Sequence, residues 1–154
     1  MANRPAKPAN MPWMTQCLTV KDVDASIAFY QKAFGFEKRF TMPGPDGRSM
    51  HGEVAWHDGL CMLGPENESC PSKSPATTGA RPSSGVYVYC EDVDALFKRA
   101  TSAGAAIEAS PEDMFWGDRM CSLIDPDGYI WSFATNVADF DLAKVPEGCM
   151  AGAT

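Results

Sequence analysis

The chain has 154 residues, of which 45% are hydrophobic and 21% charged, and its formal net charge is −7. This length suits one domain or two small halves that share a core. The acidic chain has no Lys/Arg-rich run, so we expect neither nucleic acid nor an anionic membrane surface as a partner. No apolar stretch reaches the roughly 18 residues that a membrane-spanning helix requires.

The cysteines and the N-terminal segment indicate a reducing compartment. Six cysteines are scattered without a Cys-x-x-Cys pair, and residues 1–13 hold prolines and polar residues where a secretory signal has an apolar run. We therefore expect a cytoplasmic protein with thiols in place of disulfides. Residues 1–12 are expected to form a flexible leader.

Residues 13–64 carry the pattern of one folded unit. Alternation predicts a strand over Trp13–Val20, and Asp22 or Asp24 can cap a helix that ends at Gly35. The elements expected after this helix are a strand over Phe36–Met42, a turn at Pro43–Gly47, and a hairpin of Ser49–Trp56 and Leu60–Leu63. Residues 65–84 are rich in Pro, Ser, Gly and Thr and predict a linker that also forms a lid.

Residues 85–136 repeat this order of elements. The expected elements are a strand over Val86–Cys90, a helix from Asp92 to Gly104, a short strand over Ala106–Ala109, a turn at Ser110–Asp113, and a hairpin of Phe115–Ile124 and Tyr129–Thr135 around Asp125–Gly128. Three landmarks recur at a nearly constant offset, with 70 residues from Asp22 to Asp92, 69 from Gly35 to Gly104 and 69 from Gly59 to Gly128. Residues 137–154 form a tail with a weak apolar pattern.

The repeat predicts an α+β fold made of two βαβββ units in tandem. One helix covers only one face of each small sheet, so the other face must be covered or must line a site. Pairing the two units would give a concave mixed sheet, and a concave, partly apolar surface is the usual setting of a small-molecule site.

The two halves resemble the vicinal oxygen chelate superfamily, which includes glyoxalase I, extradiol dioxygenases and the fosfomycin and bleomycin resistance proteins. The resemblance lies in Thr19–Tyr30 with Phe34–Phe36, which is similar to the superfamily's first-helix signature, and in the last hairpin at Asp125–Gly128. Phe115–Arg119, followed by this hairpin, most resembles the PhnB-like branch. One fold hosts many chemistries, so the resemblance implies a reaction only weakly.

Enzymes of this superfamily hold a divalent metal with His, Gln or Glu on equivalent strands of both halves. The resemblance places those positions at Thr15, Leu63, Gly85 and Ser132, none of which suits a catalytic divalent ion. A shift of one residue would bring Gln16 to the first position only. We therefore expect no metal and no other cofactor at the usual site.

Two groups of side chains are candidates for ligand binding. His51 and Glu53 alternate on one strand and share a face, where they could bind a ligand or metal or simply be polar surface residues. The second group, Phe115, Trp116, Arg119 and Trp131, offers aromatic walls and one guanidinium for a flat or anionic organic ligand. The alternative for this group is structural, with Trp131 in the core and Arg119 paired with Asp118, Glu53 or Asp125.

Tyr87 and Tyr89 alternate with Val86 and Val88 and are expected to serve in core or dimer packing. The leading functional hypothesis is a metal-free protein of the glyoxalase/bleomycin-resistance type that binds a small organic molecule as a homodimer. The alternatives are a metal-dependent lyase or dioxygenase that uses His51 and Glu53, and a non-catalytic structural or interaction module.

Overall fold

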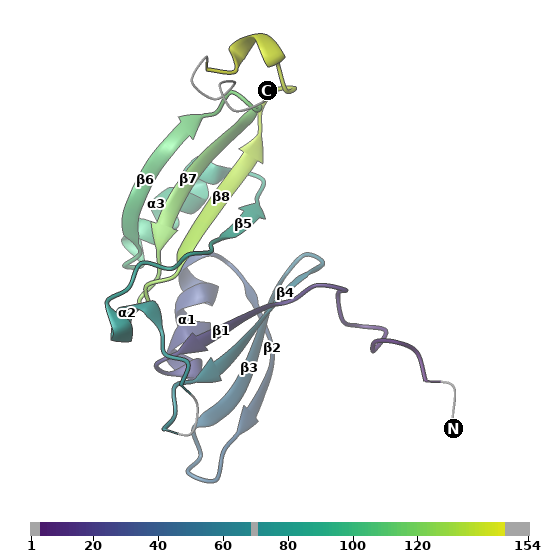
Figure 1. Ribbon diagram of the computed structural model, residues 1–154, viewed down its shortest axis with the longest axis vertical. Helices are drawn as coiled ribbons and strands as arrows, with labels where there is room; N and C mark the ends of the chain where they lie inside the picture. The colour runs from purple at the N-terminus through teal and green to yellow at the C-terminus, as the bar shows by residue number, and fades with distance from the viewer. Residues whose placement is uncertain (1–3, 69–70, 147–154) are drawn as a thin grey trace. The chain divides into compact units, whose positions relative to one another are not determined.

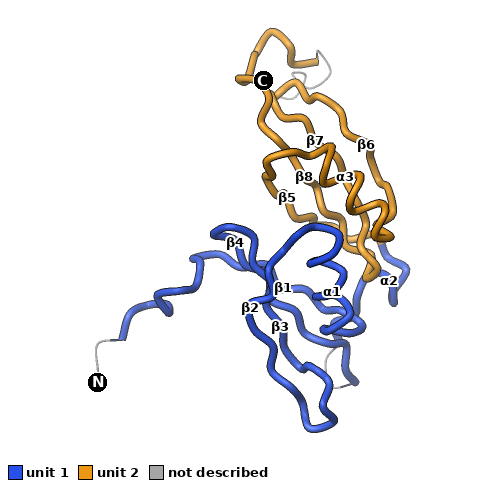
Figure 2. Tube along the Cα trace, turned by 180° about the vertical axis from the view of Figure 1, so that it is seen from behind, with its two compact units in different colours: residues 1–80 blue, residues 81–154 orange. Residues whose placement is uncertain are grey.

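The computed structural model describes residues 4–68 and 71–146. The chain forms two compact units, unit 1 over residues 1–80 and unit 2 over residues 81–154, which Figure 2 colours blue and orange. Each unit has one four-stranded mixed sheet with a helix packed on one side (Figure 1). This is the predicted pair of βαβββ units. No helix of the described residues has the length and apolar character needed to cross a membrane.

Unit 1 runs β1 (Gln16–Val20), α1 (Val23–Ala33), β2 (Glu37–Pro43), β3 (Ser49–Trp56), β4 (Gly59–Pro65) and α2 (Pro75–Thr78). The strand order is β1-β4-β3-β2, with β1 parallel to β4 and the other pairs antiparallel. The first strand begins three residues later than predicted, because Trp13 and Met14 lie outside the sheet with 83% and 88% of their surfaces exposed.

The local signals of the first helix act as the sequence predicts. The Asp22 carboxylate accepts a hydrogen bond from the Ala25 amide at 2.9 Å, which is worth about 1 kcal/mol for such a cap. Gly35 ends the helix with a φ of 81°. The helix lies close to the sheet at Gly52, because a Cβ there would lie 2.6 Å from Val23 and 2.8 Å from Ile27.

Unit 2 runs β5 (Val86–Tyr89), α3 (Val93–Ser102), β6 (Ala106–Asp113), β7 (Asp118–Ile124), β8 (Ile130–Asn136) and the 3₁₀ turn η1 (Leu142–Lys144). The strand order β5-β8-β7-β6 and the parallel β5–β8 pair repeat the topology of unit 1. Asp92 caps α3 through the Ala95 amide, as Asp22 caps α1.

The predicted turn at Ser110–Asp113 is wrong, because these residues continue β6. A strand can pass through Pro111 here because β6 is an edge strand and its pairing with β7 is irregular between Ala109 and Glu112. The prediction that Phe115 begins the next strand is wrong as well. The chain turns over residues 114–117, and β7 begins at Asp118.

The two units match element by element, with an offset that changes between 70 and 69 residues along the chain. The offset is 69 at Gly35 and Gly104, which follow the helices, and 70 at Ser49 and Arg119, and a bulge at Met50 in β3 then reduces it to 69 again. The β7–β8 turn has one residue more than the β3–β4 turn and restores 70. Met62 is therefore the partner of Ser132 in the repeat.

The predicted linker contains a short folded segment. It includes the last residue of β4 and the turn of helix α2, which the sequence does not reveal. The Glu66 carboxylate accepts hydrogen bonds from the Ser74 amide at 2.9 Å and from the Ser74 and Thr77 hydroxyls at 2.6 Å each. These hydrogen bonds lower the pKa of Glu66 to about 2, the largest cause being the Ser74 hydroxyl.

The terminal segments make a few contacts of their own. In the leader, the Arg39 guanidinium donates to the Asn10 carbonyl at 2.9 Å. In the tail, the Val137 and Ala138 amides donate to the Gly117 carbonyl at 2.9 and 3.0 Å. The tail prediction for residues 147–154 lies outside the described residues.

Candidate functional site

The side of the unit 2 sheet opposite α3, called here the far face of unit 2, gathers the most organised polar and aromatic groups of that unit. Alternation along the strands sends Cys121, Leu123, Trp131 and Phe133 into the core beside α3. The residues of the opposite parity form the far face: Tyr87, Tyr89, Asp118, Met120, Ser122, Ser132 and Asn136.

A buried carboxylate organises this face. Asp118 is 3% exposed, and its Oδ2 accepts hydrogen bonds from the Tyr87 and Tyr89 hydroxyls, both at 2.9 Å. Its Oδ1 accepts from the Asn136 amide at 3.1 Å. Because β8 lies between β5 and β7, the two phenol rings reach across β8 to Asp118.

Of the two roles expected for Tyr87 and Tyr89, core packing is wrong, and dimer packing stays a prediction. They are 45% and 58% exposed, and their rings meet edge to face at 5.5 Å between centroids. Alternation correctly places them on one face, but it does not show which face the helix covers. Anchored by their hydroxyls, the rings offer a fixed aromatic surface.

The charge state of this cluster is well defined. Burial acts to raise the pKa of Asp118, but the hydrogen bonds from Asn136, Tyr87 and Tyr89 outweigh it, so this pKa is lowered and the carboxylate stays ionised. The pKa of Tyr87 is raised to about 12, mainly because its hydroxyl group is desolvated. The neighbouring Asp118 carboxylate also raises this pKa. Near neutral pH the cluster therefore carries one negative charge and protonated phenols.

Trp116 borders this cluster from the β6–β7 turn. Its indole Nε1 donates to the Tyr87 hydroxyl at 3.4 Å, and its ring meets Phe115 edge to face at 4.9 Å. The turn depends on Gly117, whose φ is 97° and whose added Cβ would lie 2.2 Å from the Ala138 carbonyl oxygen. Of the predicted ligand residues, Trp116 therefore lies beside Tyr87, and Phe115 packs against Trp116.

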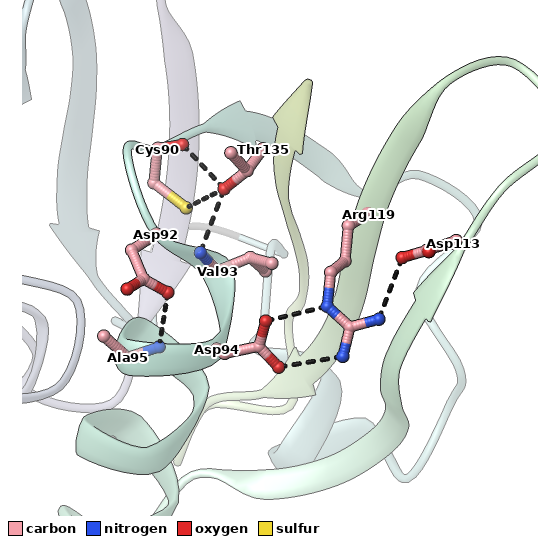
Figure 3. Close-up of polar contacts among 8 residues, drawn as sticks. All are labelled: Cys90, Asp92, Val93, Asp94, Ala95, Asp113, Arg119 and Thr135. Carbon is pink, nitrogen blue, oxygen red and sulfur yellow. Dashed lines mark hydrogen bonds and ion pairs between the residues drawn. The ribbon is translucent and has the colours of Figure 1, made fainter. Parts of the chain in front are cut away.

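Arg119 points to the opposite side of the sheet. Figure 3 shows its guanidinium against the first turn of α3, where it makes a two-pronged pair with Asp94 at 2.7 and 2.9 Å. A third bond reaches Asp113 at 2.9 Å. The partners proposed from sequence, Asp118, Glu53 and Asp125, are wrong, because β-strand alternation places the side chain on the α3 side.

Trp131 is a core residue. It is 1% exposed, and its indole Nε1 donates to the Asp125 carboxylate at 2.9 Å. Its ring stacks on Phe133 at 6.4 Å on the α3 side of the sheet. Of the four aromatic and Arg candidates, Trp116 thus contacts the far-face cluster, and Phe115 contacts Trp116. Side chains alternate between the two faces along β7 and β8, and this alternation places Arg119 and Trp131 on the α3 side.

His51 and Glu53 lie on the corresponding side of the unit 1 sheet, opposite α1. His51 Nε2 is 3.4 Å from Glu53 Oε1, and Arg39 Nη1 is 3.9 Å from Glu53 Oε2. Phe40 is 48% exposed, and its ring centroid lies 6.2 Å from that of His51. This face therefore pairs its polar groups with one another.

The positions that the resemblance assigns to metal ligands lack suitable donors. Leu63 is 1% exposed on the α1 side of its sheet, so the assignment to Leu63 is wrong, and the far-face position of the repeat belongs to Met62. Ser132 does lie on the far face, where its hydroxyl is 2.9 Å from that of Ser122. A thioether and a neutral hydroxyl do not fit a catalytic divalent cation.

The described residues also contain no cluster of three His, Cys, Asp or Glu side chains that could hold a metal ion. The donor set of the described residues therefore does not fit the divalent metal of the superfamily enzymes. No chemical step can be derived through such a metal from these residues.

Comparison with known proteins identifies the family. The profile of the Glyoxalase/Bleomycin resistance protein/Dioxygenase superfamily matches residues 11–133. The chain belongs to this superfamily. Uncharacterized proteins of Mycobacterium bovis and Mycobacterium tuberculosis are 34% identical to it over 137 residues, which are 87% of this chain and 90% and 80% of those proteins.

Several solved structures share the fold. TioX from Micromonospora sp. ML1 is 25% identical with a TM-score of 0.62, over 80% of this chain and 99% of TioX. TnmS3, an antibiotic binding protein from Streptomyces sp. CB03234, is 26% identical with a TM-score of 0.56, over 81% and 97%. The fosfomycin resistance protein FosX from Listeria monocytogenes, at 14% identity and a TM-score of 0.61 over 90% and 97%, supports the fold alone.

Proposed function

We propose that this superfamily member binds a small, flat organic molecule on the far face of unit 2, against Tyr87, Tyr89 and Trp116. The observation that carries the proposal is the pair of half-exposed phenol rings that Asp118 holds in place. Fixed aromatic faces bind ligands with little loss of side-chain freedom. The described strands β1 to β4 place no such anchored rings on the side of the unit 1 sheet opposite α1, called here the far face of unit 1.

The comparisons support this class of function. TnmS3, at 26% identity over most of both chains, is an antibiotic binding protein. A binding protein needs no ligand set for a metal, which agrees with the donors found at Met62 and Ser132. The Phe115–Arg119 motif also supports a place in the PhnB-like branch, which stays part of the proposal.

A titration of planar aromatic compounds, followed by tryptophan fluorescence and calorimetry, tests the proposal. The double variant Tyr87→Ala/Tyr89→Ala removes both rings and is expected to weaken binding by about 10- to 100-fold. Phe40→Ala, which removes an exposed ring from unit 1, is the matched control and should leave affinity unchanged. Equal losses in both variants, or a loss only in the control, would contradict the proposed site.

The competing function is a metal-dependent lyase or dioxygenase that uses His51 and Glu53, which lie 3.4 Å apart. Catalytic zinc sites take about three protein ligands, so these two residues would need a third. Metal analysis of protein purified without chelator distinguishes the two functions. One tightly bound divalent ion per chain that is lost in His51→Ala would favour the enzyme.

The proposal includes a cytosolic homodimer. Each sheet has two edge strands, β1 and β2 in unit 1 and β5 and β6 in unit 2, and sheet edges favour pairing with another chain. Light scattering should give twice the 16.6 kDa chain mass. A mass of 16.6 kDa at working concentration would remove the dimer but leave the binding face in place. A non-catalytic interaction module is the outcome if no small molecule binds.

A further inference from the structure

We infer that the far face of unit 2 selects flat aromatic ligands that carry a positive charge or hydrogen-bond donors, and not anionic ones. The inference rests on the proposed function and specifies its ligand class. It reverses the expectation from sequence, which took Arg119 as a partner for an anionic ligand. Three features of the cluster carry it.

The first feature is the direction of the hydrogen bonds. Both phenols use their single proton to donate to Asp118 at 2.9 Å. Each hydroxyl can therefore meet a ligand only through its oxygen lone pairs, one of which the Tyr87 oxygen already uses to accept from Trp116 Nε1 at 3.4 Å. A ligand N–H group satisfies these lone pairs, whereas a carboxylate or sulfonate oxygen opposes them.

The second feature is the charge behind the rings. Among the described residues, no Lys, Arg or His forms an ion pair with Asp118, whose hydrogen bonds come from neutral groups. The charge acts through a poorly solvated region, because Asp118 is only 3% exposed. Electrostatic interactions are stronger in such surroundings than in bulk water.

The third feature is the lack of cations on the part of this face formed by β5, β7 and β8, three described strands. None of the far-face residues of β5, β7 and β8, all of which the structure describes, is a Lys, Arg or His. Arg119, the one guanidinium of these strands, is engaged by Asp94 and Asp113 on the other side. Tyr and Trp rings attract cations through their π faces, which adds to the preference.

The test compares three probes of similar ring size on the intact protein by calorimetry. Proflavine is a planar cation, acridine is neutral near neutral pH, and 9-anthracenecarboxylate is an anion. The expected order of affinity is proflavine, then acridine, then the carboxylate, with about tenfold or more between the first and the last. A tenfold ratio corresponds to about 1.4 kcal/mol.

Asp118→Asn keeps the shape of the side chain and removes its charge. Because Asp118 also holds the two phenol rings, both probes are expected to bind the variant more weakly, and the affinity for proflavine should fall about tenfold more than the affinity for acridine. Asp58→Asn, in the β3–β4 turn of unit 1, removes one charge elsewhere and controls for the net charge of −7. It should leave all three affinities unchanged.

The outcomes separate the inference from the proposed function. If all three probes bind with equal affinity, or the anion binds best, the inference is overturned and the binding face stands. If no probe binds, both are overturned. A preference for proflavine that Asp58→Asn removes as strongly as Asp118→Asn would show general surface charge and would also overturn the inference. The probe series on the wild-type chain decides the question even if Asp118→Asn does not fold.

Discussion

The two units place different side chains on the same frame. At the repeat positions of Tyr87 and Tyr89, unit 1 has Cys17 and Thr19, and at the position of Asp118 it has Arg48. Unit 1 instead carries His51 and Glu53, which lie close enough to satisfy each other. An identical strand order thus supports one face with an anchored aromatic cluster and one without it.

Positions that recur in both units serve the fold, whereas positions that differ between the units are candidates for function. Caps, turns and core positions recur in both units, because each βαβββ unit must bury one face of its sheet. Asp24 binds Ser49 in unit 1 just as Asp94 binds Arg119 in unit 2, so both helices are tied to the third strand of their sheets. The side chains of the two far faces do not recur, so these faces are where the two units differ.

The largest expected effect is on the free energy of unfolding. It concerns a core position at which the repeat partners differ greatly in size, Trp131 in unit 2 and Cys61 in unit 1. Trp131→Ala should reduce the free energy of unfolding by about 3–5 kcal/mol, because it leaves a large cavity beside Phe133. Urea denaturation followed by circular dichroism measures this loss. The matched change Cys61→Ala should cost far less, and an equal cost in both units would contradict the assignment of Trp131 to the core.

The next effect concerns two glycines that occupy the same place in the turn before the third strand of each unit. Gly47 and Gly117 have φ values of 82° and 97°, so alanine at either costs about 1–2 kcal/mol of backbone strain. At Gly117 the new Cβ also meets the Ala138 carbonyl at 2.2 Å, whereas at Gly47 nothing lies within 4 Å. Thermal unfolding should therefore show a clearly larger loss for Gly117→Ala than for Gly47→Ala.

Gly117→Ala should also weaken ligand binding, because Trp116 precedes Gly117 in the same turn. Gly47→Ala should leave binding unchanged. If Gly117→Ala binds the planar probes as the wild type does, Trp116 is not part of the site.

A smaller effect on stability is expected from the hydrogen bonds that join the helix to the third strand in each unit. Arg119→Met should lower the melting temperature by a few degrees and leave ligand affinity unchanged, because the guanidinium lies on the α3 side. The hydrogen bond from Arg119 is the main reason that the pKa of Asp94 is lowered. This stabilisation is complete above the unfolded pKa of about 3.9 and is lost as pH falls through the lower folded value.

The melting temperatures of wild type and Arg119→Met should therefore converge at acidic pH. The comparison is Ser49→Ala, which removes the equivalent hydrogen bond to Asp24 in unit 1 without removing a charge. Its effect on the melting temperature should change less with pH. A loss of ligand affinity in Arg119→Met would show that the guanidinium contacts the ligand after all.

The smallest effect on stability is expected at Glu66, whose repeat partner is Asn136. Its hydrogen bonds with Ser74 and Thr77 stabilise the fold above the ordinary pKa of 4.5, and this stabilisation is lost as pH falls towards the folded value of about 2. Glu66→Gln should therefore reduce stability slightly near neutral pH and have a vanishing effect at the acid end. Proteolysis of the segment that contains α2 is a second readout, which should be faster in the variant.

Much of the frame could be predicted from the sequence, because its signals are local. Asp22 and Asp92 cap helices through amides three residues away, and Gly35 follows the last helical turn. The constant offset between such landmarks then revealed the repeat. Pro111 misled the prediction because edge strands tolerate proline, and position at an edge depends on the whole sheet.

The candidate site was harder to predict, because it depends on which face of a sheet the helix covers. Tyr87 and Tyr89 were correctly placed on one face by alternation, but their sequence does not show that this face is opposite α3. Arg119 and Asp118 are neighbours in sequence and point to opposite sides, so their proximity suggested a pair that the strand does not permit. The Met50 bulge shifted the repeat by one residue, and local patterns do not reveal a bulge.

The most direct test of the account maps the bound probe onto the two faces. In a ¹H–¹⁵N correlation spectrum of the labelled protein, proflavine should shift the amide signals of Tyr87, Tyr89, Trp116 and Asp118 and their neighbours in β8. The signals of β3 around His51 and Glu53 should stay in place, as should those of α3. Shifts centred on β3, or spread evenly over both units, would contradict the claim that the far face of unit 2 is the binding site.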